Sequence, residues 1–195
     1  MALYRRRLPH IDEIGKAVFI TWKLQGSLPS NRSFPEASLS SGQAFLAMDL
    51  LLEQTRSGPL YLSQPAIASM IVDAILYIAE VLGHYELHAF AVMPNHVHLL
   101  ITPSVPLWKL TKSLKSTTAP RANEMLGLTG TTFWQEESYD HTVRDGREFG
   151  SISRYIEHNP VRAGLATAAD DFRWSSATRG SRADLGVRPT LPVLS

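Results

Sequence analysis

The chain has 195 residues, of which 44% are hydrophobic, and a formal net charge of +1, which suits one domain with a sizeable core and excludes a protein that coats DNA through overall positive charge. It has no cysteine, which excludes disulfides, thiolate metal sites and cysteine nucleophiles and fits a reducing compartment. No apolar run approaches the roughly 20 residues of a membrane span and no secretory signal is recognisable, so we expect a cytoplasmic protein with no membrane partner.

The predicted elements are read from hydrophobic periodicity and from glycine and proline positions. Ser63 is expected to cap one helix and Pro160 to end the last one. In chain order, the patterns predict a strand over 16–27, a loop over 28–42, a helix over 43–56, a helix over 63–83, strands over 85–93 and 97–103 joined by a turn at residues 94–95, a helix within 104–127, a strand over 138–143 and a helix over 146–159.

Strands and helices interleave around a central antiparallel hairpin. This order predicts an α+β fold, a ferredoxin-like split β-α-β sandwich with an antiparallel sheet and helices on one face. We expect residues 1–178 to form a single domain with an insert at 28–62. Residues 179–195 are expected to form a C-terminal tail.

Two histidines stand out in the second strand of the hairpin. Because side chains alternate along a strand, His96 and His98 share one face while Val97 points to the other. On a helix-covered sheet the histidines would occupy the more open face, with Cα atoms about 7 Å apart. That spacing allows both imidazoles to bind one metal ion, although two histidines that bond only to solvent or neighbours fit the pattern too.

The last predicted helix carries two further candidate site residues. Tyr155 and Asn159 are four residues apart and so share a helix face. A phenol beside a metal-bound phosphate can act as a nucleophile, and a carboxamide oxygen can bind a hard metal ion. The same spacing also fits an aromatic at the edge of the core and a residue at a helix C-terminus.

The segment "MPNHVHLLITP" (93–103), followed by "YIEHNPVRAGL" (155–165), resembles the single-tyrosine HUH nucleases, in which two histidines flank a hydrophobic residue, here Val97. The resemblance is to the REP-associated tyrosine transposases in particular, relatives of the small single-strand DNA transposases of bacterial insertion sequences. Further similar segments extend it over about residues 4–177.

This resemblance implies a metal-dependent single-stranded DNA endonuclease and strand transferase that acts on hairpin DNA. His96 and His98 would bind the divalent metal, Mg²⁺ or Mn²⁺, with Asn159 completing the site. Tyr155 would attack a phosphodiester and form a 5′-phosphotyrosine intermediate, which a 3′-hydroxyl can attack in reverse. The protein would act as a monomer or a homodimer.

DNA contacts are expected from local basic groups, which neutralise phosphates and give salt-dependent affinity. The lysines among them also fit an ordinary solvated helix face. Trp108 and Trp134 would either stack on unpaired bases or lie in the core. The predicted contacts are Arg5, Arg6, Arg7, Lys109, Lys112, Lys115, Arg144 and Arg162.

Two other functions remain open at this point. One is a catalytically retired DNA-hairpin-binding protein, and the other is a mononuclear metal hydrolase that uses water as its nucleophile. Hydrolase sites of that kind usually gather more histidines or aspartates near the histidine pair, whereas the nearest acidic residues in sequence, Glu86 and Glu124, are not well placed on the same strand. A covalent protein–DNA adduct would distinguish the tyrosine nuclease from both.

Overall fold

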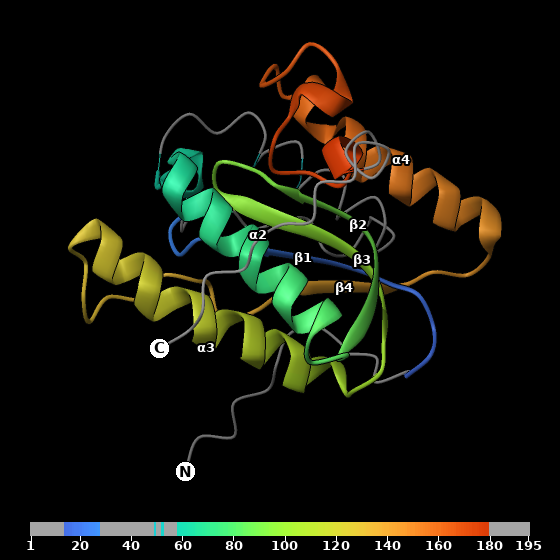
Figure 1. Ribbon diagram of the computed structural model, residues 1–195, viewed down its shortest axis with the longest axis horizontal. Coiled ribbons are helices and arrows are strands. Elements are labelled where there is room, and N and C mark those ends of the chain that lie inside the picture. Colours follow the sequence, from blue (N-terminus) through green and yellow to red (C-terminus); the bar gives the residue numbers. More distant parts are fainter. Residues whose placement is uncertain (1–13, 28–48, 50–51, 53–57, 180–195) are drawn as a thin grey trace, which may run out of the picture.

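A computed structural model describes residues 14–27, 49, 52 and 58–179. Within them, four antiparallel strands form one sheet in the order β2-β3-β1-β4 (Figure 1). This strand order, with one helix before the central hairpin and one after it, confirms the predicted ferredoxin-like fold. The elements are β1 (Val18–Lys23), η1 (Tyr61–Ser63), α2 (Pro65–Glu80), β2 (Tyr85–Val92), β3 (His96–Pro103), α3 (Leu107–Leu126), β4 (Tyr139–Thr142), α4 (Gly146–Arg162) and η2 (Ala169–Asp171).

The sheet is covered on both faces. Alternation along β3 sends Val97, Leu99 and Ile101 to the face that α2 and α3 cover. Leu100 points the other way and belongs to a second core with Ile156 of α4. The prediction of helices on one face therefore holds for α2 and α3 and is wrong for α4, whose apolar stripe packs on the opposite face.

Two predicted helix ends differ from the structure. Ser63 does not cap α2, because it ends η1 and its hydroxyl donates to the Leu60 carbonyl at 2.6 Å, which leaves Gln64 as the residue before the helix. Pro160 does not end α4, which continues to Arg162. A proline lacks only its own N–H, so in the last turn it costs the helix a single main-chain hydrogen bond.

A short C-terminal segment, residues 174–176, extends the sheet beyond β2. Main-chain hydrogen bonds of 2.9 Å join Trp174 and Ser176 to β2. The Trp174 indole N–H donates to the hydroxyl of Ser69 on α2 at 3.2 Å, and the Ser176 hydroxyl donates to Glu157 on α4 at 3.0 Å. This segment thus connects the helices of both faces to one sheet edge.

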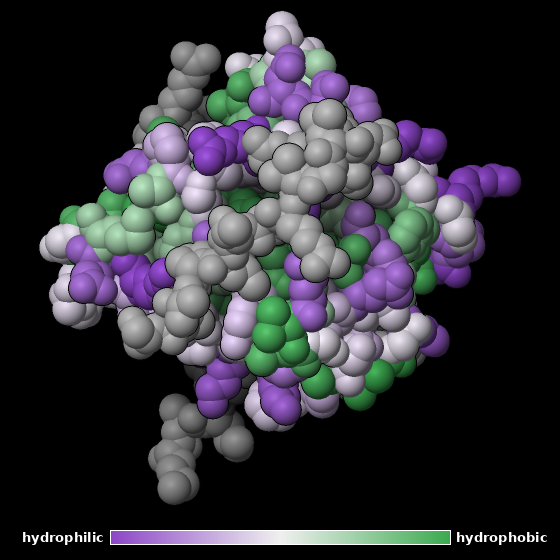
Figure 2. Space-filling model, viewed as in Figure 1, coloured by the Kyte–Doolittle hydropathy of each residue, from purple (hydrophilic) through white to green (hydrophobic). Residues whose placement is uncertain are grey.

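Several predictions fall outside the described residues: the N-terminal arginine arm, the loop over 28–42 and the tail over 179–195 apart from its first residue. Of the helix predicted over 43–56, Asp49 and Leu52 are described, and both are helical and buried. No helix of the described part is long and apolar enough to cross a membrane. Hydrophilic side chains are spread over the face seen in Figure 2, with smaller hydrophobic groups between them.

Candidate metal centre and nucleophile

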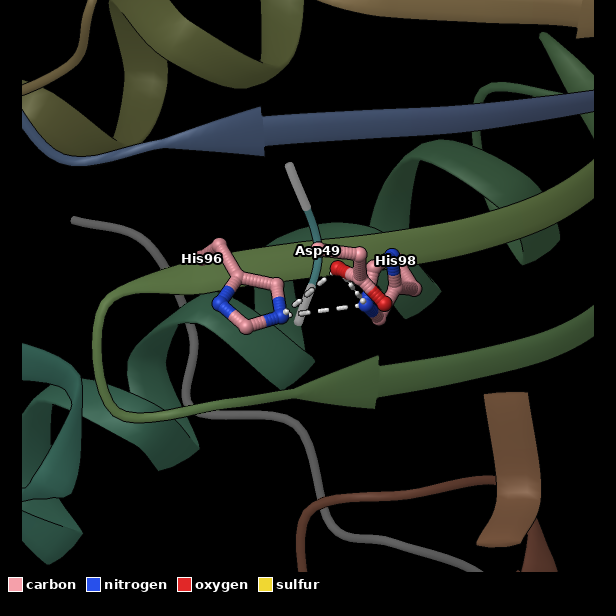
Figure 3. A group of neighbouring side chains, drawn as sticks. All are labelled: Asp49, His96 and His98. Atoms are coloured by element: carbon pink, nitrogen blue, oxygen red, sulfur yellow. Dashed lines mark hydrogen bonds and ion pairs between the residues drawn. The ribbon is translucent and has the colours of Figure 1, made fainter. Parts of the chain in front are cut away.

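His96 and His98 form a buried cluster with Asp49 on the face of the sheet that α4 covers (Figure 3). The Nε2 atoms of the two histidines are 3.0 Å apart. Asp49 Oδ1 lies 3.5 Å from Nε2 of His96 and 3.2 Å from Nε2 of His98. One nitrogen or oxygen from each residue therefore converges on a common point, as ligands of a shared ion do.

The expectation of an open face for the histidines is wrong. His96, His98 and Asp49 each have 0% of their surface exposed, since α4 covers this side of the sheet and Asp49 lies against the rings. Asp49 was not predicted as part of the site. Its one sequence signal is an acidic residue inside the apolar run "AFLAMDLLL", where a carboxylate is expensive to bury without a partner.

Asp49 and His96 are held in the forms that bind metals. Burial alone would raise the pKa of Asp49, but its interactions with His98, including a hydrogen bond, and with His96 and Arg162 outweigh burial and bring that pKa below its ordinary value. Burial, assisted by His98, lowers the pKa of His96 to about 3. A carboxylate and a neutral imidazole are the ligand forms required for coordination.

Asn159 adds a fourth side chain to the cluster from α4. Its Nδ2 lies 3.0 Å from Nε2 of His98 and donates to Asp49 Oδ2 at 3.4 Å. Its Oδ1 is buried and has no hydrogen-bond partner among the described residues. Such an acceptor, beside two imidazoles and a carboxylate, makes a mixed nitrogen and oxygen donor set that fits a divalent cation.

Tyr155 lies one helical turn before Asn159 and packs against the cluster. Its ring centroid is 6.0 Å from that of His98 and 6.4 Å from that of Phe19, in edge-to-face arrangements. Arg162 places its guanidinium carbon 4.9 Å from the centre of the Tyr155 ring. The tyrosine is half-buried, so its ring is held by packing while part of its surface remains accessible.

Lys23 is a cation near this cluster that the sequence did not single out. It is the cross-strand partner of His96 in the β1–β3 pairing, so the two side chains share one face of the sheet. Burial lowers the pKa of Lys23 to about 8, against the opposing influence of Glu137.

The other predicted DNA contacts within the described residues, Lys109, Lys112, Lys115 and Arg144, are not brought to the cluster. Lys109, Lys112 and Lys115 lie on α3, which covers the opposite face of the sheet. Lys115 donates to the carbonyls of Gln135 and Glu136 at 2.9 and 2.8 Å. Arg144 is exposed in the turn that precedes α4, more than two helical turns from Tyr155.

Trp134 and Trp108, the two tryptophans considered for base stacking, differ in exposure: one is buried and the other is exposed. Trp134 belongs to the core and donates its indole N–H to the Thr118 hydroxyl at 2.8 Å. Trp108 is 51% exposed at the start of α3 and keeps an aromatic surface available to a partner. Among the predicted site residues, those that the structure brings together are His96, His98, Tyr155, Asn159 and Arg162.

Comparison with known proteins matches the family described as "Transposase IS200 like" to residues 64–159, a range that contains both histidines, Tyr155 and Asn159. A curated protein of Haemophilus influenzae, whose name assigns it to the REP-associated tyrosine transposases, is 23% identical over an alignment of 125 residues, and the match covers 56% of this chain and 71% of the relative. A solved structure of a REP-associated tyrosine transposase bound to a REP hairpin has a TM-score of 0.56 and 19% identity, over 97% of this chain and 89% of its own. That structural likeness supports the fold described above.

Proposed function

We propose that the chain is an IS200-like transposase that cleaves and rejoins single-stranded DNA through a covalent bond to Tyr155, because that family's model matches residues 64–159 and a REP-associated relative matches part of the chain. The observation that carries the proposal is the packing of Tyr155 against His98, a member of the buried metal-ligand cluster. A tyrosine phenol and a metal centre on one sheet face are the two components that a phosphodiester transfer through tyrosine requires.

Asp49, His96 and His98 would hold the divalent cation, Mg²⁺ or Mn²⁺, together with Asn159. A half-turn of the Asn159 carboxamide exchanges Oδ1 and Nδ2 and would turn its oxygen toward the same point. Bound there, the cation would polarise a phosphodiester and offset the negative charge that develops on its oxygens.

Tyr155 supplies the nucleophile. Its phenolic oxygen loses a proton and attacks the phosphorus, the bond from phosphorus to the 3′-oxygen breaks, and that oxygen leaves as a 3′-hydroxyl after taking up a proton. The product is a 5′-phosphotyrosine. Because one phosphoester replaces another, a 3′-hydroxyl can attack it in reverse and join strands without a nucleotide cofactor.

Arg162 assists this step. A guanidinium that lies over the face of a phenol ring favours negative charge on that ring as the proton leaves. The positive charge of Arg162 also helps to lower the pKa of Asp49 and so to keep it ionised. Arg162 thus supports both the nucleophile and the ligand set from one position on the last turn of α4.

We propose hairpin DNA as the substrate, because a solved structure of similar fold is described as bound to a REP hairpin. Arg162 would contact DNA near the scissile phosphate, and Lys109 and Lys112, which are exposed on α3, would contact phosphates farther away. Trp108 offers an exposed ring on the same helix for stacking on an unpaired base.

The test is a reaction of the full chain with end-labelled hairpin DNA and Mn²⁺, resolved on a denaturing protein gel. A labelled protein band is expected, and it should vanish with chelator or with Tyr155→Phe. Tyr139→Phe is the matched control, because the Tyr139 and Tyr155 rings both lie 6.4 Å from the Phe19 ring. Tyr139→Phe should still form the adduct.

The remaining outcomes separate the alternatives. Hairpin binding with neither cleavage nor adduct supports a retired DNA-hairpin-binding protein. Cleavage without an adduct supports a metal hydrolase that uses water as its nucleophile. This alternative gains support from Asp49, which gives the histidine pair the carboxylate partner that the sequence did not reveal. An adduct that persists in Tyr155→Phe refutes the assignment of the nucleophile.

A further inference from the structure

The side chain of Asn95 joins His96 of the metal-ligand cluster to Leu52, three residues after Asp49. Asn95 lies in the turn before β3 and is 2% exposed. Its Nδ2 donates to the main-chain carbonyl of Leu52 at 3.1 Å, and its Oδ1 lies 2.6 Å from Nδ1 of His96. One carboxamide therefore contacts both a histidine of the cluster and the main chain of Leu52, three residues after Asp49.

The contact with Leu52 determines which way this carboxamide points. A main-chain carbonyl only accepts hydrogen bonds, so Nδ2 must face Leu52 and Oδ1 must face His96. A carboxamide oxygen also only accepts, so Nδ1 of His96 must carry the hydrogen. A neutral imidazole has a single N–H, which leaves Nε2 of His96 with its lone pair directed at His98 and Asp49.

His98 is held differently. Its Nδ1 lies 2.7 Å from the Thr21 hydroxyl, which can either donate or accept. That contact by itself is compatible with both tautomers of His98, whose Nε2 also lies 3.0 Å from Nδ2 of Asn159 within the cluster, whereas the contact with Asn95 permits one tautomer of His96. The chain therefore fixes His96 in the ligand form through a group outside the cluster.

The main chain of Asn95 is also fixed. Its carbonyl accepts from the N–H of Leu24 at 2.9 Å and from the hydroxyl of Ser27 at 3.3 Å. These two bonds attach the turn to the end of β1, where Lys23 pairs with His96. A carboxamide held from both sides in this way can orient a ring more strictly than an exposed side chain or a water molecule.

We propose that Asn95 is a positioning residue of the metal centre, which holds His96 in the Nδ1–H tautomer and links Leu52, three residues after Asp49, to the start of β3. The inference rests on the proposed function, because the metal centre gives this tautomer its purpose. Groups that bond the second ring nitrogen of a metal-binding histidine contribute roughly 10- to 100-fold to metal affinity. We expect the same range for Asn95.

The test combines Mn²⁺ titration of the full chain, followed by the electron paramagnetic resonance of free Mn²⁺, with ¹⁵N NMR of the histidine rings in the metal-free protein. Asn95→Leu removes both hydrogen bonds and should weaken Mn²⁺ binding roughly 10- to 100-fold and leave His96 in a mixture of tautomers. Asn123→Leu is the matched control, because it removes another buried carboxamide that donates to a carbonyl, on α3 and away from the cluster. It should leave Mn²⁺ affinity unchanged.

Asn95→Asp keeps an acceptor for His96 but sets an oxygen against the Leu52 carbonyl. It should retain the Nδ1–H tautomer and lose Mn²⁺ affinity, so it decides the case if Asn95→Leu does not fold. The proposal is overturned if the Asn95 variants bind Mn²⁺ like the wild type, if Asn123→Leu loses as much affinity as they do, or if the wild type binds no Mn²⁺. Normal Mn²⁺ binding and the expected tautomer in a wild type that forms no DNA adduct refute the transposase chemistry alone and support the role of Asn95.

Discussion

Replacement of Asp49 by asparagine tests whether this residue is a metal ligand or a structural partner of the two histidines. Asp49→Asn preserves the size of the side chain and removes its charge. In the metal-free protein the new carboxamide can donate to an imidazole nitrogen, and no buried charge has to be compensated. We therefore expect the free energy of unfolding in chelator to stay within about 1 kcal/mol of the wild type.

The effect on metal binding should be much larger. Asp49 Oδ1 is 3.2 and 3.5 Å from the two Nε2 atoms and is the one charged member of the set. Loss of a charge-assisted contact costs about 1.5–3 kcal/mol, or roughly 10- to 100-fold in dissociation constant. At an Mn²⁺ concentration about 100 times the wild-type Kd, the metal stabilises the fold by about 2.7 kcal/mol, and by about 0.4 kcal/mol if the affinity falls 100-fold.

Thermal unfolding with Mn²⁺ and with chelator measures this difference. For a chain of this length, about 2.7 kcal/mol corresponds to a rise in Tm of roughly 5–11 °C, which should shrink to about 1 °C in Asp49→Asn for a 100-fold loss. Asp73→Asn, an exposed aspartate on α2, is the control and should respond to Mn²⁺ like the wild type. An Mn²⁺-dependent rise in Asp49→Asn equal to that of the wild type would refute the assignment of Asp49 as a ligand.

Three further predictions follow from contacts described above. Arg162→Gln should slow single-turnover adduct formation roughly five- to tenfold, because the cation over the Tyr155 ring is lost, and an unchanged rate contradicts that role. Lys112→Gln should reduce the slope of log affinity for the hairpin against log salt concentration by about one unit. Lys115→Gln should lower Tm instead, because the Lys115 ammonium donates to two main-chain carbonyls. Equal salt slopes for the two variants would contradict this assignment. Burial raises the pKa of Tyr85, so above pH 10 this tyrosine ionises in the unfolded chain before it does in the folded one. The free energy of unfolding of the wild type, measured in urea, should therefore fall by about 1.4 kcal/mol per pH unit relative to Tyr85→Phe. Parallel pH profiles of the two proteins would contradict this reasoning.

The sheet and its histidine face were predictable because strand alternation is a local property. The sequence placed His96 and His98 on one face and Val97 on the other, and the structure confirms this separation. The face on which α4 packs was not predictable in the same way. A helix with one apolar stripe can cover either side of a sheet, and the choice depends on the tertiary partner of Ile156.

The composition of the site was only partly predictable for a similar reason. Tyr155 and Asn159 share a helix face by their spacing, so their proximity followed from local geometry. Asp49 lies far earlier in the chain and reaches the histidines only through tertiary packing. Even Asn95, the direct neighbour of His96, acquires its orientation from the distant carbonyl of Leu52.

Tyr155 and Asn159 sit on the same helix, α4, and contact His98 of their own chain. This arrangement has a kinetic consequence: adduct formation on excess hairpin should be first order in protein, down to concentrations at which any dimer dissociates. If the proposed site works within one chain, mixing a variant that lacks His98 with a variant that lacks Tyr155 should not restore adduct formation. Each copy of the chain would then carry its own nucleophile and metal ligands to the DNA.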